Sequence, residues 1–289
     1  MEELLDPGLG RVRVFLMPDD NKPRKLKYNL GHRRILAFGG AYSNLIRAVA
    51  EAGQRHGIET IGVIRGEEHL PLNPVLARAA ACGMTLTYLD RAAYRRKHTE
   101  EVRAALRARW GEDVAILPEG GSNAAAVRGC AELPGEIGVP YDVVCCPVGT
   151  GGTLAGLAAG LPEGKRALGF AVLKGGAFLA GEVARLQRET YGRTWDNWSI
   201  ELGHHFGGYA RTTPELEEFA ARHGVERIYV AKMLWGVLDL ARRGAFEPGA
   251  RVVAVLTGRR DDAGAQPSTP VAACGAPTGL DSGEPRWRR

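Results

Sequence analysis

Residues 143–156 constrain the fold of this chain more than any other segment. An apolar run with β-branched residues, 143–148, is followed by a turn of glycine and threonine and then by small residues that suit a helix. A helix that starts this way leaves its first backbone N–H groups without intrahelical acceptors, and its dipole favours negative charge there. We therefore expect an anion site in the turn, which consists of Gly149, Thr150, Gly151, Gly152 and Thr153.

The turn matches neither of the two common nucleotide-binding motifs. It is not followed by the Gly-Lys-Ser/Thr of a Walker A turn, and Leu154 occupies the position of the third glycine of G-x-G-x-x-G. A phosphate monoester therefore fits the turn better than ATP or NAD. The alternative is a tight strand-to-helix turn that binds no ligand.

Strand-like and helix-like patterns alternate along the chain and predict an α/β fold. The predicted strands are 34–38, 60–64, 85–89, 114–117, 143–148, 168–173 and 252–256. The predicted helices are 44–54, 74–82, 100–110, 153–161, 178–191, 214–222 and 230–243. This alternation favours mostly parallel sheets with helices on both faces. Separate glycine-rich turns near residues 40 and 150 suggest two sheets with a cleft between them.

Composition restricts the class of protein. The chain has 289 residues, of which 45% are hydrophobic and 25% charged, as in an ordinary soluble globular protein. We expect a cytoplasmic protein, because no run could cross a membrane and the first residues do not resemble a signal peptide. The five cysteines form no C-x-x-C pair and no zinc spacing, so we expect no metal. The net charge of +5 makes nucleic-acid binding an alternative, but the chain carries no motif typical of nucleic-acid recognition.

The last segment, 259–289, differs from the rest of the chain. Its residues are mainly Gly, Pro, Ala, Ser, Asp and Arg, without periodicity. Such a segment buries too little apolar surface to offset its ordering entropy, so we predict a disordered or atypical tail.

A group of lysines lies ahead of the first predicted sheet. Lys22 is near the start of a short helix-like segment, where its amine could react with a cofactor aldehyde or simply be a surface lysine. We expect Lys25 and Lys27 to be solvated surface side chains. Ser43 and Asn44 follow a strand and could cap the next helix or face a carboxylate.

Six segments, in order, resemble one known family of pyridoxal-phosphate enzymes. The chain resembles the 1-aminocyclopropane-1-carboxylate deaminase/D-cysteine desulfhydrase family from about residue 21 to 258. The segments that carry the resemblance are 21–26, 38–44, 118–123, 149–153, 206–209 and 228–233. The resemblance implies a two-domain, three-layer tryptophan synthase β-like fold (PLP fold type II). It implies a small domain at 31–129 and a large cofactor-binding domain from 1–30 and 130–258.

The resemblance also implies roles for single residues. Lys22 would bind pyridoxal 5'-phosphate covalently and then carry the α-proton of the substrate. Asn44 would hydrogen-bond the phenolic oxygen of the cofactor, and Ser43 would meet the substrate carboxylate. Tyr229 would lie against the pyridine ring, and Tyr209 would reach the substrate. Residues 149–153 would hold the phosphate, and the protein would be a homodimer.

The residue after Tyr229 separates two branches of this family. In the deaminase branch a glutamate there meets the pyridine nitrogen, whereas this chain has Val230. Thr257 matches the threonine of the desulfhydrase branch and would leave the nitrogen largely unprotonated. We therefore expect β-elimination from a small amino acid such as D-cysteine, giving pyruvate, sulfide and ammonia, rather than cyclopropane ring opening.

Three departures from the family pattern keep other functions open. Leu45 replaces the usual His or Gln, the sequence after Thr257 differs, and Asp19 and Asp20 replace a longer loop. A non-catalytic or altered-specificity pyridoxal-phosphate-binding relative is therefore an alternative, as is 1-aminocyclopropane-1-carboxylate deaminase.

Overall fold

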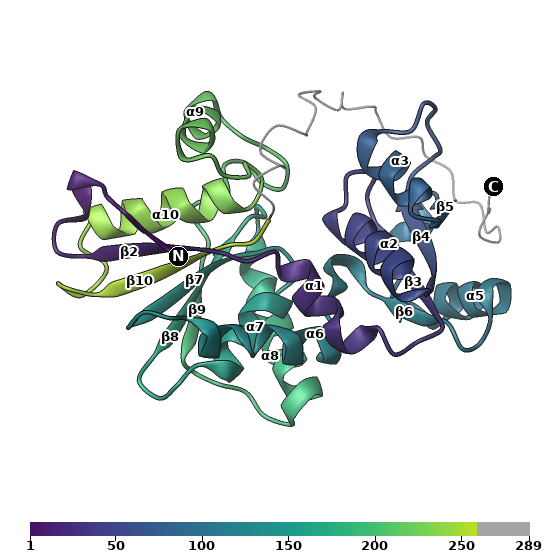
Figure 1. Ribbon diagram of the computed structural model, residues 1–289, viewed down its shortest axis with the longest axis horizontal. Helices are drawn as coiled ribbons and strands as arrows, with labels where there is room; N and C mark the ends of the chain where they lie inside the picture. Colours follow the sequence, from purple (N-terminus) through teal and green to yellow (C-terminus); the bar gives the residue numbers. More distant parts are fainter. Residues whose placement is uncertain (259–289) are drawn as a thin grey trace. The chain divides into compact units, whose positions relative to one another are not determined.

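The computed structural model describes residues 1–258, which form two compact units (Figure 1). Unit 1 comprises residues 1–29 and 120–258, and unit 2 comprises residues 30–119. The predicted tail, 259–289, lies outside the described residues.

Unit 1 is built on a sheet of six strands in the order β1-β2-β10-β7-β8-β9. All neighbouring strands are parallel except β1 and β2, which are antiparallel. The strands are β1 (Glu2–Leu4), β2 (Arg13–Pro18), β7 (Val143–Val148), β8 (Arg166–Ala171), β9 (Trp198–Glu201) and β10 (Arg251–Leu256).

Helices cover both faces of this sheet, which gives three layers. The helices are α1 (Asn21–Leu26), α6 (Ala124–Cys130), α7 (Gly152–Gly160), α8 (Leu179–Tyr191), α9 (Pro214–His223) and α10 (Val230–Arg242). Alternate residues of β10 enter opposite cores: Val252 packs with residues of α9 and α10, and Val253 packs with residues of α7 and α8. Figure 1 shows α10 on one side of the sheet and α7 and α8 on the other. A parallel sheet needs this double cover because both of its faces are apolar.

Unit 2 contains a parallel sheet of four strands in the order β5-β4-β3-β6. The strands are β3 (Arg34–Gly39), β4 (Glu59–Arg65), β5 (Thr85–Leu89) and β6 (Ala115–Leu117). The helices are α2 (Asn44–His56), α3 (Pro74–Ala81), α4 (Arg91–Arg95) and α5 (Glu100–Trp110). One core of this unit joins Phe38 of β3 to Tyr94 of α4 and Leu106 of α5. Short 3-10 turns complete the described chain at Pro7–Leu9, Lys27–Asn29, Glu119–Gly121, Leu133–Glu136 and Gly176–Phe178.

The structure confirms the predicted α/β class with mostly parallel sheets, and every predicted helix and strand is present within about two residues of its predicted bounds. Several elements were missed, chiefly β2 and α6, whereas α1 falls within the short helix-like segment expected around Lys22. The segment of β2 lies between charged residues, and α6 is too short to show helical periodicity.

Residues 120–129 lie in unit 1, whereas the family resemblance implies a small domain that reaches residue 129. The cause is close packing of α6 on α1: a Cβ added to Gly129 would come within 2.1 Å of the Arg24 carbonyl oxygen. The side chains of Asn29 and Asn123 add hydrogen bonds between the two segments.

Asp142, just before β7, joins the starts of three neighbouring strands. Its carboxylate accepts hydrogen bonds from the backbone N–H of Arg251 at 3.0 Å, from the Arg251 guanidinium at 2.9 and 3.0 Å, and from Lys165 at 3.2 Å. Its own backbone carbonyl accepts from the N–H of Arg166. These contacts, chiefly those from the Arg251 side chain, hold the pKa of the carboxyl well below its usual value of 3.8.

We expect Asp142→Asn to destabilise the protein in a pH-dependent way. A carboxyl whose pKa is lowered by folding stabilises the folded state above its unfolded pKa, and this contribution is lost as the pH falls through the folded pKa. At pH 7 the loss of unfolding free energy should be about 1 kcal/mol, since the carboxylate is partly exposed and screened.

Urea denaturation of both proteins at pH 7 and at about pH 3, below the unfolded pKa, measures this effect. The difference between wild type and Asp142→Asn should shrink at the lower pH. Glu218→Gln, which removes an exposed pair with Arg222, is the control and should change little at either pH. A difference that is independent of pH would contradict the prediction.

Candidate active site

The carboxyl ends of three neighbouring parallel strands, β2, β10 and β7, lie along one edge of the sheet in unit 1. At the end of β10, Leu256 pairs with Pro18 of β2, and the carbonyl of Leu256 accepts from the N–H of Asp19 at 3.1 Å. The segments that leave these strands therefore meet at this edge: Lys22 after β2, Thr257 after β10 and the turn 149–153 after β7. Ligand sites in parallel sheets form at such edges.

The turn after β7 leads into α7 without a side-chain cap. Gly151, at the N-cap, has a φ of 81°, in the left-handed region that suits glycine, and no side chain caps the helix. The first N–H groups of α7 are thus left for another acceptor, and the helix dipole makes an anion favourable there. This geometry is compatible with the anion site expected from the sequence, which stays a prediction.

One asparagine connects Lys22 with this turn. Lys22, the second residue of α1, donates from Nζ to Oδ1 of Asn21 at 3.3 Å, and Nδ2 of Asn21 donates to Oγ1 of Thr153 at 3.0 Å. Asn21 and Thr153 are both buried. The side chain of Asn21 therefore bridges the amine of Lys22 and Thr153, the second residue of α7.

Lys25 is buried with only 4% of its surface exposed, so the expectation of a solvated lysine was wrong. Its Nζ donates to the carbonyl of Gly120 at 3.1 Å and to Oγ of Ser122 at 3.3 Å. The Ser122 hydroxyl in turn lies 2.7 Å from the Thr150 hydroxyl. Burial lowers the pKa of Lys25. Lys25 is thus linked to the turn through Ser122 and Thr150. The sequence signal for this contact was the spacing of three between Lys22 and Lys25, which places both on one face of a helix.

Ser122 and Asn123, which the sequence assigned only to a loop, are both structural contacts of this site. Asn123 caps α6, accepting from the N–H of Ala126 at 2.9 Å. A Cβ added to Gly152 would come within 2.5 Å of the Ser122 hydroxyl, so the two segments pack in direct contact. A loop rich in small residues gives no sequence signal for such packing.

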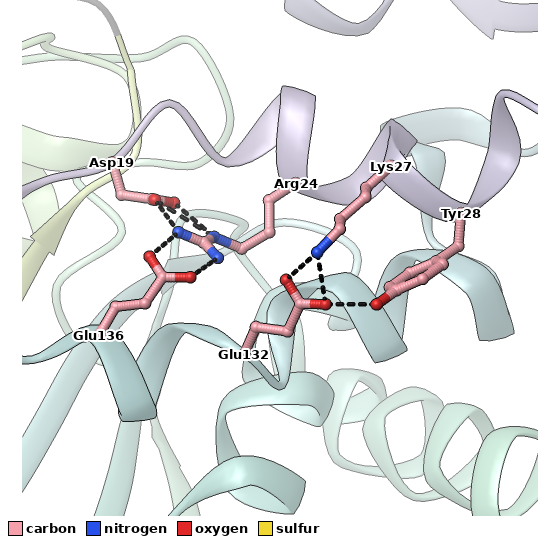
Figure 2. A network of polar contacts seen from close by, with 6 residues as sticks. All are labelled: Asp19, Arg24, Lys27, Tyr28, Glu132 and Glu136. Atoms are coloured by element: carbon pink, nitrogen blue, oxygen red, sulfur yellow. Dashed lines mark hydrogen bonds and ion pairs between the residues drawn. The ribbon is translucent and has the colours of Figure 1, made fainter.

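A polar network fastens α1 to the segment after α6 (Figure 2). Arg24 donates to both Asp19, at 2.7 Å, and Glu136, at 2.8 Å. Lys27 and Tyr28 both donate to the carboxylate of Glu132. The Arg24 hydrogen bond lowers the pKa of Glu136, and the Lys27 and Tyr28 hydrogen bonds lower that of Glu132. Both pairs restrict the helix that carries Lys22.

Three thiols lie in β7, which leads to the turn, and in α6. Cys145 and Cys146 of β7 are buried, as expected of small apolar residues in a strand, and Cys130 at the end of α6 is buried too. Burial raises the pKa of each thiol. Within residues 1–258 no group of His, Cys, Asp or Glu side chains could hold a metal ion.

Two tyrosines lie at the other end of the turn. The ring of Tyr229 packs on Gly149, where an added Cβ would come within 3.2 Å of the ring. The exposed ring of Tyr209 meets the ring of Tyr229 edge-on, with 5.7 Å between centroids. Tyr229 therefore lies beside Gly149, the first residue of the turn, and Tyr209 lies beside Tyr229.

Val230, the first residue of α10, is buried and apolar. The carboxylate of Glu226 accepts from the N–H groups of Ile228 at 2.6 Å, Tyr229 at 2.7 Å and Val230 at 3.2 Å. Glu226 thus binds the open N–H groups at the start of α10 and fixes the backbone of Tyr229. Thr257 is partly exposed at the end of β10.

Ser43 and Asn44 lie in unit 2, at the start of α2. Ser43 is the N-cap, and its hydroxyl accepts from the N–H of Ile46 at 3.4 Å. Asn44 is the first residue of the helix, and Leu45 is buried in the core of unit 2. Leu45 therefore has a packing role in this unit.

The chain matches a family described as "Pyridoxal-phosphate dependent enzyme" over residues 21–258. It is 31% identical over 264 residues to a Pyrococcus furiosus protein provisionally named 1-aminocyclopropane-1-carboxylate deaminase, covering 82% of this chain and 79% of that protein. It is 25% identical over 296 residues to the 1-aminocyclopropane-1-carboxylate deaminase of Burkholderia ambifaria, covering 84% and 86%. A crystal structure titled as an ACC deaminase homologue matches with a TM-score of 0.72 and 26% identity over 89% of this chain and 88% of that one.

No helix within residues 1–258 has the length and apolar character needed to cross a membrane.

We expect Arg24→Met to destabilise the protein more than Lys27→Met. Arg24 and Asp19 are only 14% and 11% exposed, so removing the guanidinium leaves a little-exposed carboxylate without this partner and should lower the unfolding free energy by about 2 kcal/mol. Lys27 is 53% exposed, so its loss should change the unfolding free energy by less than about 1 kcal/mol. Urea denaturation measures both variants, and equal losses would show that the Arg24 pair does not fix α1.

Proposed function

Because this chain belongs to the pyridoxal-phosphate dependent enzyme family, we propose that it eliminates the β-substituent of a small amino acid, with D-cysteine as the model substrate. The products would be pyruvate, ammonia and, from cysteine, hydrogen sulfide. The observation that carries the proposal is the chain of contacts from the Lys22 amine through Asn21 to Thr153, at the start of α7.

The residues at the edge of the sheet fit pyridoxal 5'-phosphate. The open N–H groups of residues 151–153 and the Thr150 hydroxyl would hold the phosphate, with the Lys25 ammonium behind them. Lys22 would hold the cofactor covalently through its amine, and Tyr229 would cover the ring. Thr257, at the end of the neighbouring strand, would face the pyridine nitrogen. When bound, the cofactor supplies an electron sink for the pair released with the α-proton.

Side chains of this protein would then carry out the proton transfer and hold the substrate. The Lys22 amine would take the α-proton, and the electron pair left on the α-carbon would form a double bond to the β-carbon as the β-substituent leaves with its bonding electrons. The 2-aminoacrylate released in this way is hydrolysed by water to pyruvate and ammonia. Ser43 would bind the substrate carboxylate, Asn44 would orient the cofactor ring, and Tyr209 would contact the substrate.

Val230 supports elimination over ring opening. A carboxylate at this position would keep the pyridine nitrogen protonated and the ring strongly electron-withdrawing, but Val230 is apolar and buried. A hydroxyl such as that of Thr257 does not hold a proton on the nitrogen. Loss of a good leaving group such as sulfide needs less carbanion stabilisation than breaking a carbon–carbon bond.

Opening of the cyclopropane ring of 1-aminocyclopropane-1-carboxylate is the second candidate, because the relatives of this chain carry that name. A third candidate is a cofactor-binding relative that catalyses neither reaction, which the replacement at Leu45 favours. Keto-acid release from a panel of D- and L-cysteine, D- and L-serine, β-chloroalanine and the cyclopropane substrate separates the three.

The homodimer and the cytoplasmic location stay predictions, which sedimentation and cell fractionation can test.

We expect Lys22→Ala to abolish the visible absorbance of the lysine-bound cofactor and to lower sulfide release from D-cysteine by a factor of about 10³ or more, since it removes both the covalent link and the base. Borohydride reduction of the wild type followed by peptide mass spectrometry should place the reduced cofactor on Lys22.

Lys27→Ala is the matched control, because Lys27 lies five residues further on, in the 3-10 turn that follows α1, is half-exposed and pairs with Glu132. It should retain both the absorbance and the activity. Cofactor trapped by borohydride in Lys22→Ala would show that another lysine forms the link.

A further inference from the structure

The loop between β9 and α9, residues 202–213, contains Tyr209. The residues on both sides of Tyr209 have unusual backbone angles. Phe206, Gly207, Gly208 and Ala210 have φ angles of 51°, 85°, 119° and 56°. Non-glycine residues rarely adopt such angles, and a run of them persists only where the surroundings fix the backbone.

Lys232 of α10 fixes the centre of this loop. Its side chain is fully buried, and Nζ donates to the carbonyl oxygens of His205 at 3.0 Å and Gly208 at 2.7 Å. These two carbonyls also close successive turns, since they accept from the N–H groups of Gly208 and Arg211. The Lys232 ammonium thus binds the first carbonyl of each of two successive turns, 205–208 and 208–211, the second of which contains Tyr209. A charged donor makes stronger hydrogen bonds than a neutral one.

The same helix also fixes Tyr229, the partner ring of Tyr209. Tyr229 directly precedes α10, and Lys232 lies one turn into it, flanked by the buried Ala231 and Met233. The two rings meet edge-on at 5.7 Å. The start of α10 therefore fixes the position of the Tyr229 ring directly, and Lys232 of the same helix fixes the loop that carries the Tyr209 ring.

Other contacts hold the two ends of the loop. His204 lies 2.9 Å from the Asp239 carboxylate, and the Phe206 ring meets the Trp235 ring at 5.5 Å. Both partners belong to α10. At the other end, the Thr212 hydroxyl donates to the Glu217 carboxylate at 2.6 Å. Removal of the Lys232 ammonium should therefore loosen the middle of the loop, from Gly207 to Arg211 with Tyr209, and leave both ends attached.

We propose that Lys232 is a positioning residue that holds the loop 202–213 so that Tyr209 stands beside Tyr229 and restricts which small amino acid is accepted. The substrate part of this inference rests on the proposed function. The anchoring part depends only on the contacts of Lys232.

Lys232→Met tests the inference, because methionine retains an apolar stem of similar length and removes all donors. Trypsin should cut after the exposed Arg211 about 10-fold faster than in the wild type. The KM for D-cysteine should rise about 10-fold while kcat and cofactor binding change less than about 3-fold, because the misplaced group contacts only the substrate. Arg242→Met, an exposed position on α10 paired with Asp6, is the control and should match the wild type.

A double-mutant cycle tests whether Lys232 acts through Tyr209. Tyr209→Ala should raise KM similarly, and the double variant should be no worse than either single one, since both disturb the same contact. Additive effects would overturn the positioning role. If Lys232→Met does not fold, Gly208→Ala strains the same turn at a φ of 119° and should show the same faster cleavage and raised KM.

The outcomes separate this inference from the proposed function. Unchanged cleavage after Arg211 in the folded variant overturns the anchoring, whatever the enzyme catalyses. Faster cleavage without turnover of any amino acid supports the anchoring and contradicts the proposed function. If D-cysteine then also leaves the cofactor absorbance of the wild type unchanged, the role in substrate selection is overturned as well.

Discussion

The parallel alignment of β2, β10 and β7 is the constraint on which the rest of unit 1 depends. Parallel strands end at the same edge, so segments that are more than a hundred residues apart in sequence meet there. Lys22, Thr257 and the turn 149–153 each come shortly after one of these strands. The site is therefore a product of topology: a different strand order would leave the same residues far apart.

Buried and partly buried cations make up much of the support around this edge. Lys25 binds the carbonyl and hydroxyl of the segment behind the turn, and Lys232 binds two carbonyls of a strained loop. Arg24 binds two carboxylates beside α1. A buried ammonium or guanidinium is stable only where oxygen atoms replace its water shell. Each of these cations consequently fixes the relative position of the segments that supply the oxygens.

Much of the fold could be predicted because its signals are local. The apolar strands and the periodic helices of both units follow from spacing, and the turn 149–153 shows its anion-binding character in residue types alone. The support of the site could not be predicted. Whether Lys25 is solvated or buried depends on packing against Ser122, which is 97 residues away in the sequence. The role of Lys232 depends on the backbone angles of the loop 202–213, and these angles cannot be predicted from the spacing of apolar and polar residues.

The buried thiols of β7 and α6 have a consequence for redox chemistry. Exchange with disulfides proceeds through the thiolate, and covered thiols that hold their protons react slowly. Cys130, Cys145 and Cys146 meet both conditions. A protein that handled cysteine at this edge would be surrounded by sulfide, cystine and mixed oxidation products. These three thiols would not take part in that exchange, so they would need no dedicated reductant to stay reduced.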